Sequence, residues 1–72
     1  MVWFEITNQM AAAVVMGLSA IGAAYAIAVT GSAAAGATAE KPEVFGKVLI
    51  FVALAEALAI YGLVVALMIL MG

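Results

Sequence analysis

Charged residues divide the chain into two long apolar runs. No residue from Met10 to Ala39 is charged, and from Val48 to Gly72 only Glu56 is. A helix needs about 20 apolar residues to cross the hydrocarbon core of a bilayer, and both runs exceed that length. The pattern predicts two transmembrane helices, over residues 9–38 and 42–71.

The polar residues between the two runs predict a tight connection. Residues 39–43 read AEKPE and concentrate charge in an otherwise apolar chain. Pro42 lacks an amide hydrogen and disfavours helical geometry at Lys41, so the first helix ends before it. Glu43 in the first turn of the second helix is favoured by the positive end of the helix dipole. We expect one hairpin over residues 1–72, with its polar loop at 39–43.

Composition indicates a membrane protein. Of the 72 residues, 71% are hydrophobic and 8% are charged, the mean hydropathy is +1.41 and the formal net charge is −2. Soluble proteins carry about 25% charged residues. The charge balance offers no basic patch for nucleic acid, and without cysteine or histidine we expect no cofactor and no metal site. The expected fold class is an all-α membrane protein, a two-helix transmembrane hairpin.

The positions of the two lysines predict how the hairpin is oriented in the membrane. Lys41 and Lys47 lie in or beside the loop, so the positive-inside rule places the loop in the cytoplasm and both termini on the opposite side. The first nine residues carry Glu5 and no lysine or arginine, which argues against a signal peptide. Trp3 and Phe4 suit an anchor at the membrane interface.

The first predicted helix is made mostly of small residues. Alanine, serine and glycine recur every fourth position along one face, at Ala20, Ala24, Ala28, Ser32 and Gly36, with Gly22, Ala26 and Gly31 beside them. Small residues let membrane helices approach closely. One hairpin cannot use that much small surface, so we expect packing against further copies of the chain. The second helix carries bulky side chains typical of a lipid-facing layer.

Glu56 is the candidate functional residue. In a helix over 42–71, Glu56 would lie roughly a third to half of the way through the hydrocarbon core. A charge in hydrocarbon costs about 2.5–3.5 kcal/mol on insertion scales, and such residues usually mark an ion path. Hydrocarbon favours the neutral acid because desolvation penalises the anion, whereas a water-filled channel or a cation on another protein favours the carboxylate. The group can therefore carry a proton between two environments.

The neighbours of Glu56 favour a proton over a sodium ion. A sodium ion needs roughly five or six oxygen ligands, whereas the adjacent Ala55, Ala57 and Leu58 have no side-chain oxygen. Tyr61 lies about 140° around the helix from Glu56, so its hydroxyl is expected to reach the carboxyl mainly across a contact between copies. No motif for catalysis or phosphate binding is present, and we expect no enzymatic activity in the chain itself.

Three segments resemble the proteolipid c subunit of rotary ATP synthases and ATPases. Residues 17–24 (GLSAIGAA) resemble the start of its glycine-rich inner helix, so Gly17 joins the expected packing residues. Residues 39–43 occupy the place of its polar loop, and residues 54–62 (LAEALAIYG) are similar to its ion-carrying segment. The loop and its continuation PEVFGK look closer to prokaryotic A/V-type rotors, while the first helix looks F-type. The subtype stays open between them.

The resemblance implies a function and partners. Glu56 matches the proton-binding carboxylate and Tyr61 its supporting hydroxyl, while Glu40, Lys41, Pro42 and Glu43 would contact the central stalk. The family forms a homo-oligomeric ring in a prokaryotic cell membrane or an organelle inner membrane, with the first helix of each copy on the inside of the ring. Lipid and the a subunit of the stator contact the outside of the ring. Residues that bind sodium in some members correspond here to Ile27, Ala57 and Leu58, all apolar.

Two other classes of protein share part of this pattern. A small hole-forming protein of the holin type also has two spans and self-associates, but it does not need a centred acid followed by a tyrosine. A small proton-coupled exporter also uses one membrane carboxylate, but usually has four spans, and this chain has room for two.

Overall fold

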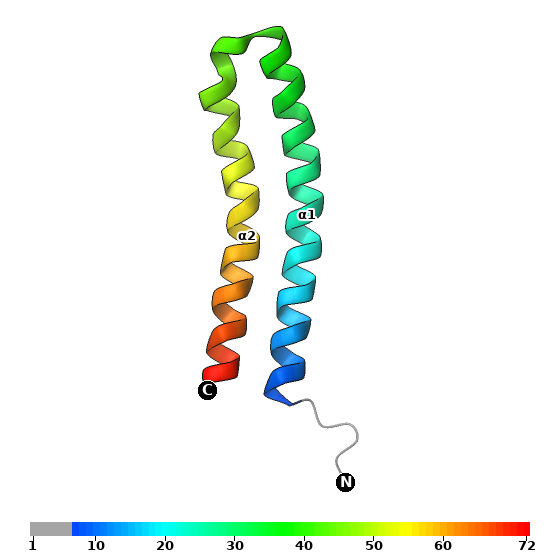
Figure 1. The fold of residues 1–72 in the computed structure, drawn as a ribbon, viewed down its shortest axis with the longest axis vertical. Helices are drawn as coiled ribbons and strands as arrows, with labels where there is room; N and C mark the ends of the chain where they lie inside the picture. The colour runs from blue at the N-terminus through cyan, green and yellow to red at the C-terminus, as the bar shows by residue number, and fades with distance from the viewer. Residues whose placement is uncertain (1–6) are drawn as a thin grey trace.

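The chain forms a two-helix hairpin in a computed structural model that describes residues 7–72. Helix α1 (Asn8–Glu40, 33 residues) and helix α2 (Phe45–Met71, 27 residues) run side by side in opposite directions, joined by Lys41 and a 3-10 turn, η1 (Pro42–Val44) (Figure 1). At about 1.5 Å per residue both helices are longer than the ~30 Å hydrocarbon core of a bilayer. The interfacial anchor predicted at Trp3 and Phe4 lies outside the described residues.

Both helices are long and apolar enough to cross a membrane. In a single hairpin they bury very little: Ala12, Ala23 and Ala66 are the only buried hydrophobic residues of the described chain, whereas most of its large apolar side chains are exposed. Exposed apolar surface on this scale is typical of contact with lipid or another protein. The fold is therefore that of an all-helical membrane hairpin.

The connection is shorter than the predicted loop. Ala39 and Glu40, expected at 39–43 in the loop, form the last turn of α1, and only Lys41 lies outside a helical segment there. The Lys41 amide donates to the carbonyl of Ala37 at 2.8 Å, which extends α1 beyond its predicted end at residue 38. The second helix begins as a 3-10 turn at Pro42 and becomes α-helical at Phe45, because proline suits a first turn where no amide donor is required.

A regular seam joins the two helices. The residues of α2 that face α1 alternate four and three positions apart: Val48, Val52, Ala55, Ala59, Gly62, Ala66 and Ile69, all buried or partly buried. A repeat averaging 3.5 residues keeps one stripe against its partner and produces the shallow crossing of a left-handed helix pair. The seam of α1 is mostly small, and its most enclosed residue is Ala23, 2% exposed.

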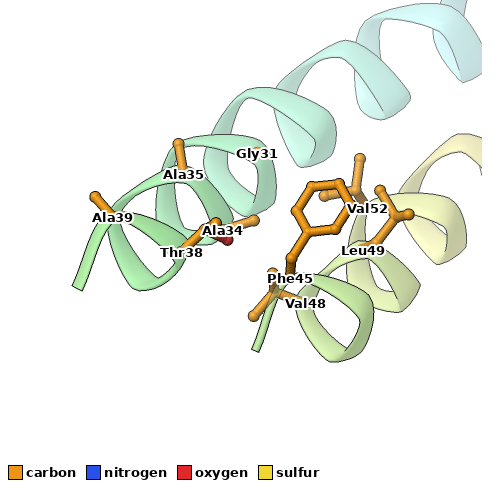
Figure 2. A pocket seen from close by; sticks show the side chains of 9 residues that line it. All are labelled: Gly31, Ala34, Ala35, Thr38, Ala39, Phe45, Val48, Leu49 and Val52. Atoms are coloured by element: carbon orange, nitrogen blue, oxygen red, sulfur yellow. The ribbon is translucent and has the colours of Figure 1, made fainter. Parts of the chain in front are cut away.

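The helices approach most closely in the half near the termini. Ser19 lies directly against Gly62, where a Cβ atom would overlap the Ser19 side chain, and a Cβ on Gly22 would lie 3.4 Å from Cδ2 of Leu58. The four buried residues, Ala12, Ala23, Gly62 and Ala66, all belong to this half. The half near the loop contains two hollows between the helices, one of which Figure 2 shows.

Candidate functional site

Glu56 lies on an exposed flank of the hairpin, in a row otherwise made of leucine. It follows the seam residue Ala55, and Leu49, Leu63 and Leu70 occupy the corresponding positions seven, seven and fourteen residues away. Those leucines are 49%, 46% and 49% exposed, so the row has a uniform environment along the helix. The carboxylate therefore stands where the pattern of the helix specifies a side chain for lipid or for another apolar surface.

The contact between Gly22 and Leu58 identifies the α1 residues beside Glu56. Ala24 and Glu56 are each two positions from that contact, which is about 200° around their own helices. Both also lie about 3 Å closer to the loop, because the helices are antiparallel. Glu56 and Ala24 thus share one side of the hairpin at one height. We call this side the Glu56 flank and the opposite side, with Gly22 and Leu58, the Leu58 flank.

No side-chain oxygen of the described hairpin is placed to assist Glu56. Tyr25 is two positions from the buried Ala23 and therefore points away from α2. The hydroxyl of Thr30 donates to the carbonyl of Ala26 at 2.7 Å, and Ser19 lies against Gly62. Within residues 7–72 no group of three or more acidic, histidine or cysteine side chains could hold a metal ion.

Tyr61 is exposed and lies on the other side of α2 from Glu56. Five residues separate the two, which is about 140° around the helix, and Tyr61 is only about 60° from Leu58. A single hairpin therefore keeps the tyrosine hydroxyl away from the carboxylate. Two copies placed side by side, with the Glu56 flank of one against the Leu58 flank of the next, bring the two side chains to the same contact.

The predicted packing residues of α1 divide between two surfaces. Gly22, Ala26 and Gly31 are partly buried, whereas Gly17, Ala24 and Ala28 are exposed. Alanine and glycine fill the whole Glu56 flank of α1, at Ala13, Gly17, Ala20, Ala24, Ala28, Gly31 and Ala35. A Cβ on Gly17 or Gly31 would meet nothing within 4 Å. The hairpin itself thus leaves this flat flank uncovered.

The charged residues near the turn are all exposed at one end of the molecule. Glu40 closes α1, Lys41 links the helices, and Pro42 and Glu43 begin the 3-10 turn. Lys47 follows one turn later on α2. They present a compact polar end to whatever lies beyond the membrane on that side.

Sequence reasoning missed the hollow on the Glu56 flank. It measures about 450 Å³, and its lining is mostly hydrocarbon, with Thr38 as its one polar side chain. Figure 2 shows the aromatic ring of Phe45 with Val48, Leu49 and Val52 on α2, across from the small side chains of α1. A hollow depends on how far two helices separate, so no residue pattern in a single helix signals it.

Known proteins match most of the chain. Residues 10–69 match the family described as the C subunit of ATP synthase. The chain is 48% identical over 54 residues to the c''2 subunit of the V-type proton ATPase of Arabidopsis thaliana, an alignment covering 75% of this chain and 30% of that protein. It is 39% identical over 59 residues to the human 16 kDa proteolipid, the c subunit of the V-type proton ATPase, covering 82% and 38%. For the c subunit of the V-type proton ATPase of Candida tropicalis the identity is 38% over 60 residues, covering 83% and 38%.

These curated relatives are longer than the chain. It spans between 30% and 38% of their length. No solved structure gives a significant match.

Proposed function

Because the chain belongs to the family of the ATP synthase C subunit, we propose that it is the proton-carrying rotor subunit of a membrane ATP synthase or ATPase, with Glu56 as the proton-binding group. The observation that carries the proposal is the single carboxylate in the exposed leucine row, with no counter-charge beside it in the described hairpin. Such a group is stable in lipid only as the neutral acid. Binding one proton converts the carboxylate to that acid, and releasing it restores the charge.

The small flank of α1 supports a ring of identical hairpins, and the family resemblance implies that α1 lies on the inside. One face packs on α2, the Glu56 flank is flat and small, and the opposite face carries exposed bulky residues: Met10, Val14, Leu18, Ile21, Tyr25 and Val29. A flat small flank suits close contact with a neighbouring helix. Contacts that join one flank to the opposite flank of the next copy are heterologous, and they close into a ring when the rotation permits.

Within such a ring Tyr61 of one copy supports Glu56 of the next. Tyr61 is five residues, about 7.5 Å, nearer the termini than Glu56. Side chains of α2 lean toward the helix N-terminus, which is the loop end, so the hydroxyl is carried toward the level of the carboxyl. A hydrogen bond there holds the acid in place while the copy faces lipid.

Coupling requires a stator that the chain does not contain. A half-channel in the stator's a subunit supplies the proton, the neutral acid turns past lipid, and a stator cation stabilises the carboxylate when the proton leaves. The exposed residues 40–43 would grip the central stalk, whose rotation drives catalysis elsewhere. The relatives' names specify protons, and the lack of oxygen ligands near Glu56 in the described hairpin supports the same ion here.

The orientation we propose places the loop in the cytoplasm and both termini on the other side. Lys41 and Lys47 both lie at the loop end, in agreement with the positive-inside rule. The membrane would be a prokaryotic cell membrane or an organelle inner membrane. The family match gives no support to the hole-forming alternative.

Glu56→Gln tests the proposal, since it removes the titratable proton and keeps the shape of the side chain. In proteoliposomes containing the complete complex, we expect rings of normal size and proton flux below detection, measured with a pH-sensitive dye. Leu63→Gln is the matched control, because it places an amide in the same row, seven residues from Glu56, and leaves Glu56 intact; flux should persist. Flux retained in Glu56→Gln would remove Glu56 from the mechanism.

A further inference from the structure

The two hollows near the loop lie on opposite sides of the hairpin. The hollow of about 450 Å³ is bordered by Leu49 and Gly31, which stand seven residues from Glu56 and from Ala24, so it opens on the Glu56 flank. The second hollow, about 350 Å³, is bordered by Phe51, which stands seven residues from Leu58. Ala34 and Val48 line both and form the partition between them. One flank therefore offers a cavity and the other offers an aromatic side chain.

The hollow and Phe51 lie at the same height. Phe51 immediately precedes Val52, which lines the hollow on the other flank. In a ring with rotational symmetry about an axis along the helices, every copy has the same height, so each flank meets residues of its own level on the next copy. Side chains of α2 lean toward the loop, which moves the Phe51 ring toward the middle of the neighbouring hollow.

The chemistry of the hollow selects an apolar occupant. Its lining on α2 is Phe45, Val48, Leu49 and Val52, and on α1 it is mainly alanine and glycine. A buried water needs two to four polar partners, and the only polar side chain in this lining is Thr38. An aromatic ring fills such a space well and can meet Phe45 in an offset or edge-to-face contact.

We infer that Phe51 of each copy inserts into the hollow on the Glu56 flank of the next copy and seals the space between Glu56 and the loop end of the ring. The inference rests on the proposed ring. Leu49 borders the hollow one heptad from Glu56 in the same row, so the hollow lies directly on the loop side of the acid. Filled by Phe51, it separates the carboxyl from water at the loop end wherever no stator is present.

Cross-linking tests the contact. The chain has no cysteine, so rings can be co-assembled from one chain with Phe51→Cys and one with Val52→Cys and treated with a short thiol-bridging reagent. We expect mixed dimers on a denaturing gel. The control pairs Val52→Cys with Ala53→Cys, because Ala53 is exposed and at nearly the same height as Phe51 but lies about 200° away around α2; its dimers should be at least fivefold fewer. Equal yields would overturn the inference.

Reagent access tests the seal. In isolated rings, Phe51→Ala should raise labelling of Glu56 by a water-soluble carbodiimide about tenfold. Val64→Ala should leave it unchanged, because the exposed Val64 lies about 180° around α2 from the seam residue Ala55, away from both flanks. Equal labelling in intact Phe51→Ala and unaltered rings would refute the seal. Native mass spectrometry of the unaltered chain separates this result from failure of the proposed function: without rings the proposed function fails, whereas rings without the cross-link or the access change refute only the role of Phe51.

Discussion

The contact between Ser19 and Gly62 makes a sharp prediction about stability. A Cβ added at Gly62 would overlap both Cβ and Oγ of Ser19. Rotating the Ser19 side chain moves Oγ but not Cβ, which is fixed to the backbone. Because carbon atoms normally stay about 3.5–4.0 Å apart, the helices must separate locally by about 1 Å or more. Overpacking of this kind costs about 1–3 kcal/mol, so Gly62→Ala should destabilise the hairpin by that amount.

Second substitutions at Ser19 test whether the overlap with the Ser19 Cβ atom causes the loss of stability. In the Gly62→Ala background, Ser19→Ala should restore nothing, because it keeps the Cβ atom. Ser19→Gly should restore most of the loss, less about 1 kcal/mol for glycine inside a helix. The control is Gly36→Ala, where the added Cβ meets nothing within 4 Å.

Stability can be measured by unfolding the hairpin with SDS in mixed micelles, with one fluorescent dye on each helix. The mole fraction of SDS at which energy transfer between the dyes is lost reports the stability. Equal rescue by Ser19→Ala and Ser19→Gly, or an effect of Gly36→Ala as large as that of Gly62→Ala, would show that the helices do not touch there.

The remaining predictions concern the acid, its supporting hydroxyl and the start of α1. A hydrophobic carbodiimide should label Glu56 faster as the pH falls, since it reacts with the neutral acid, and millimolar sodium should give little protection; strong protection would contradict proton binding. Tyr61→Phe should speed that labelling in intact rings about 2- to 10-fold, the value of one neutral hydrogen bond, and an unchanged rate would exclude the hydroxyl from the site. Thr7 accepts from the Met10 amide at 3.1 Å, so Thr7→Ala should cost about 1 kcal/mol at this helix end and speed exchange of the Met10 amide about fivefold, whereas Thr7→Ser should not.

The sequence was sufficient for the architecture because charge and proline are unambiguous in an apolar chain. Uncharged runs of this length predict spans whatever their packing, and Pro42 locates the turn. On α2 the small residues Ala59, Gly62 and Ala66 share one side of an otherwise bulky helix, a pattern that suits packing on the first helix or on a neighbouring hairpin, and the structure places them against α1.

The facing surface of α1 was not predictable in the same way. The row containing Ala20, Ala24 and Ala28, which we expect to pack against further copies, is exposed in the hairpin, and the residues buried against α2 are Ala12 and Ala23. Because α1 is small on several sides, composition does not single out one face. The fit of Ser19 against Gly62 selects it, and that fit exists only when both helices are present.

The hollows escaped prediction for a related reason. They arise because the helices pack tightly near the termini and less tightly near the loop, a property of the pair. Phe51 looked like one more lipid-facing residue of α2, and only the hollow on the opposite flank gives it a candidate partner.

The one-residue link at Lys41 has a mechanical consequence. With regular hydrogen-bonded segments on both sides of it, the turn contains almost no slack that could stretch or twist under load. If the polar end grips a rotating shaft, torque applied there passes directly into two continuous helices and reaches the level of Glu56 with little loss. Elastic energy in such a machine would then be stored in the shaft or the stator, and the hairpins would act as rigid elements that transmit torque.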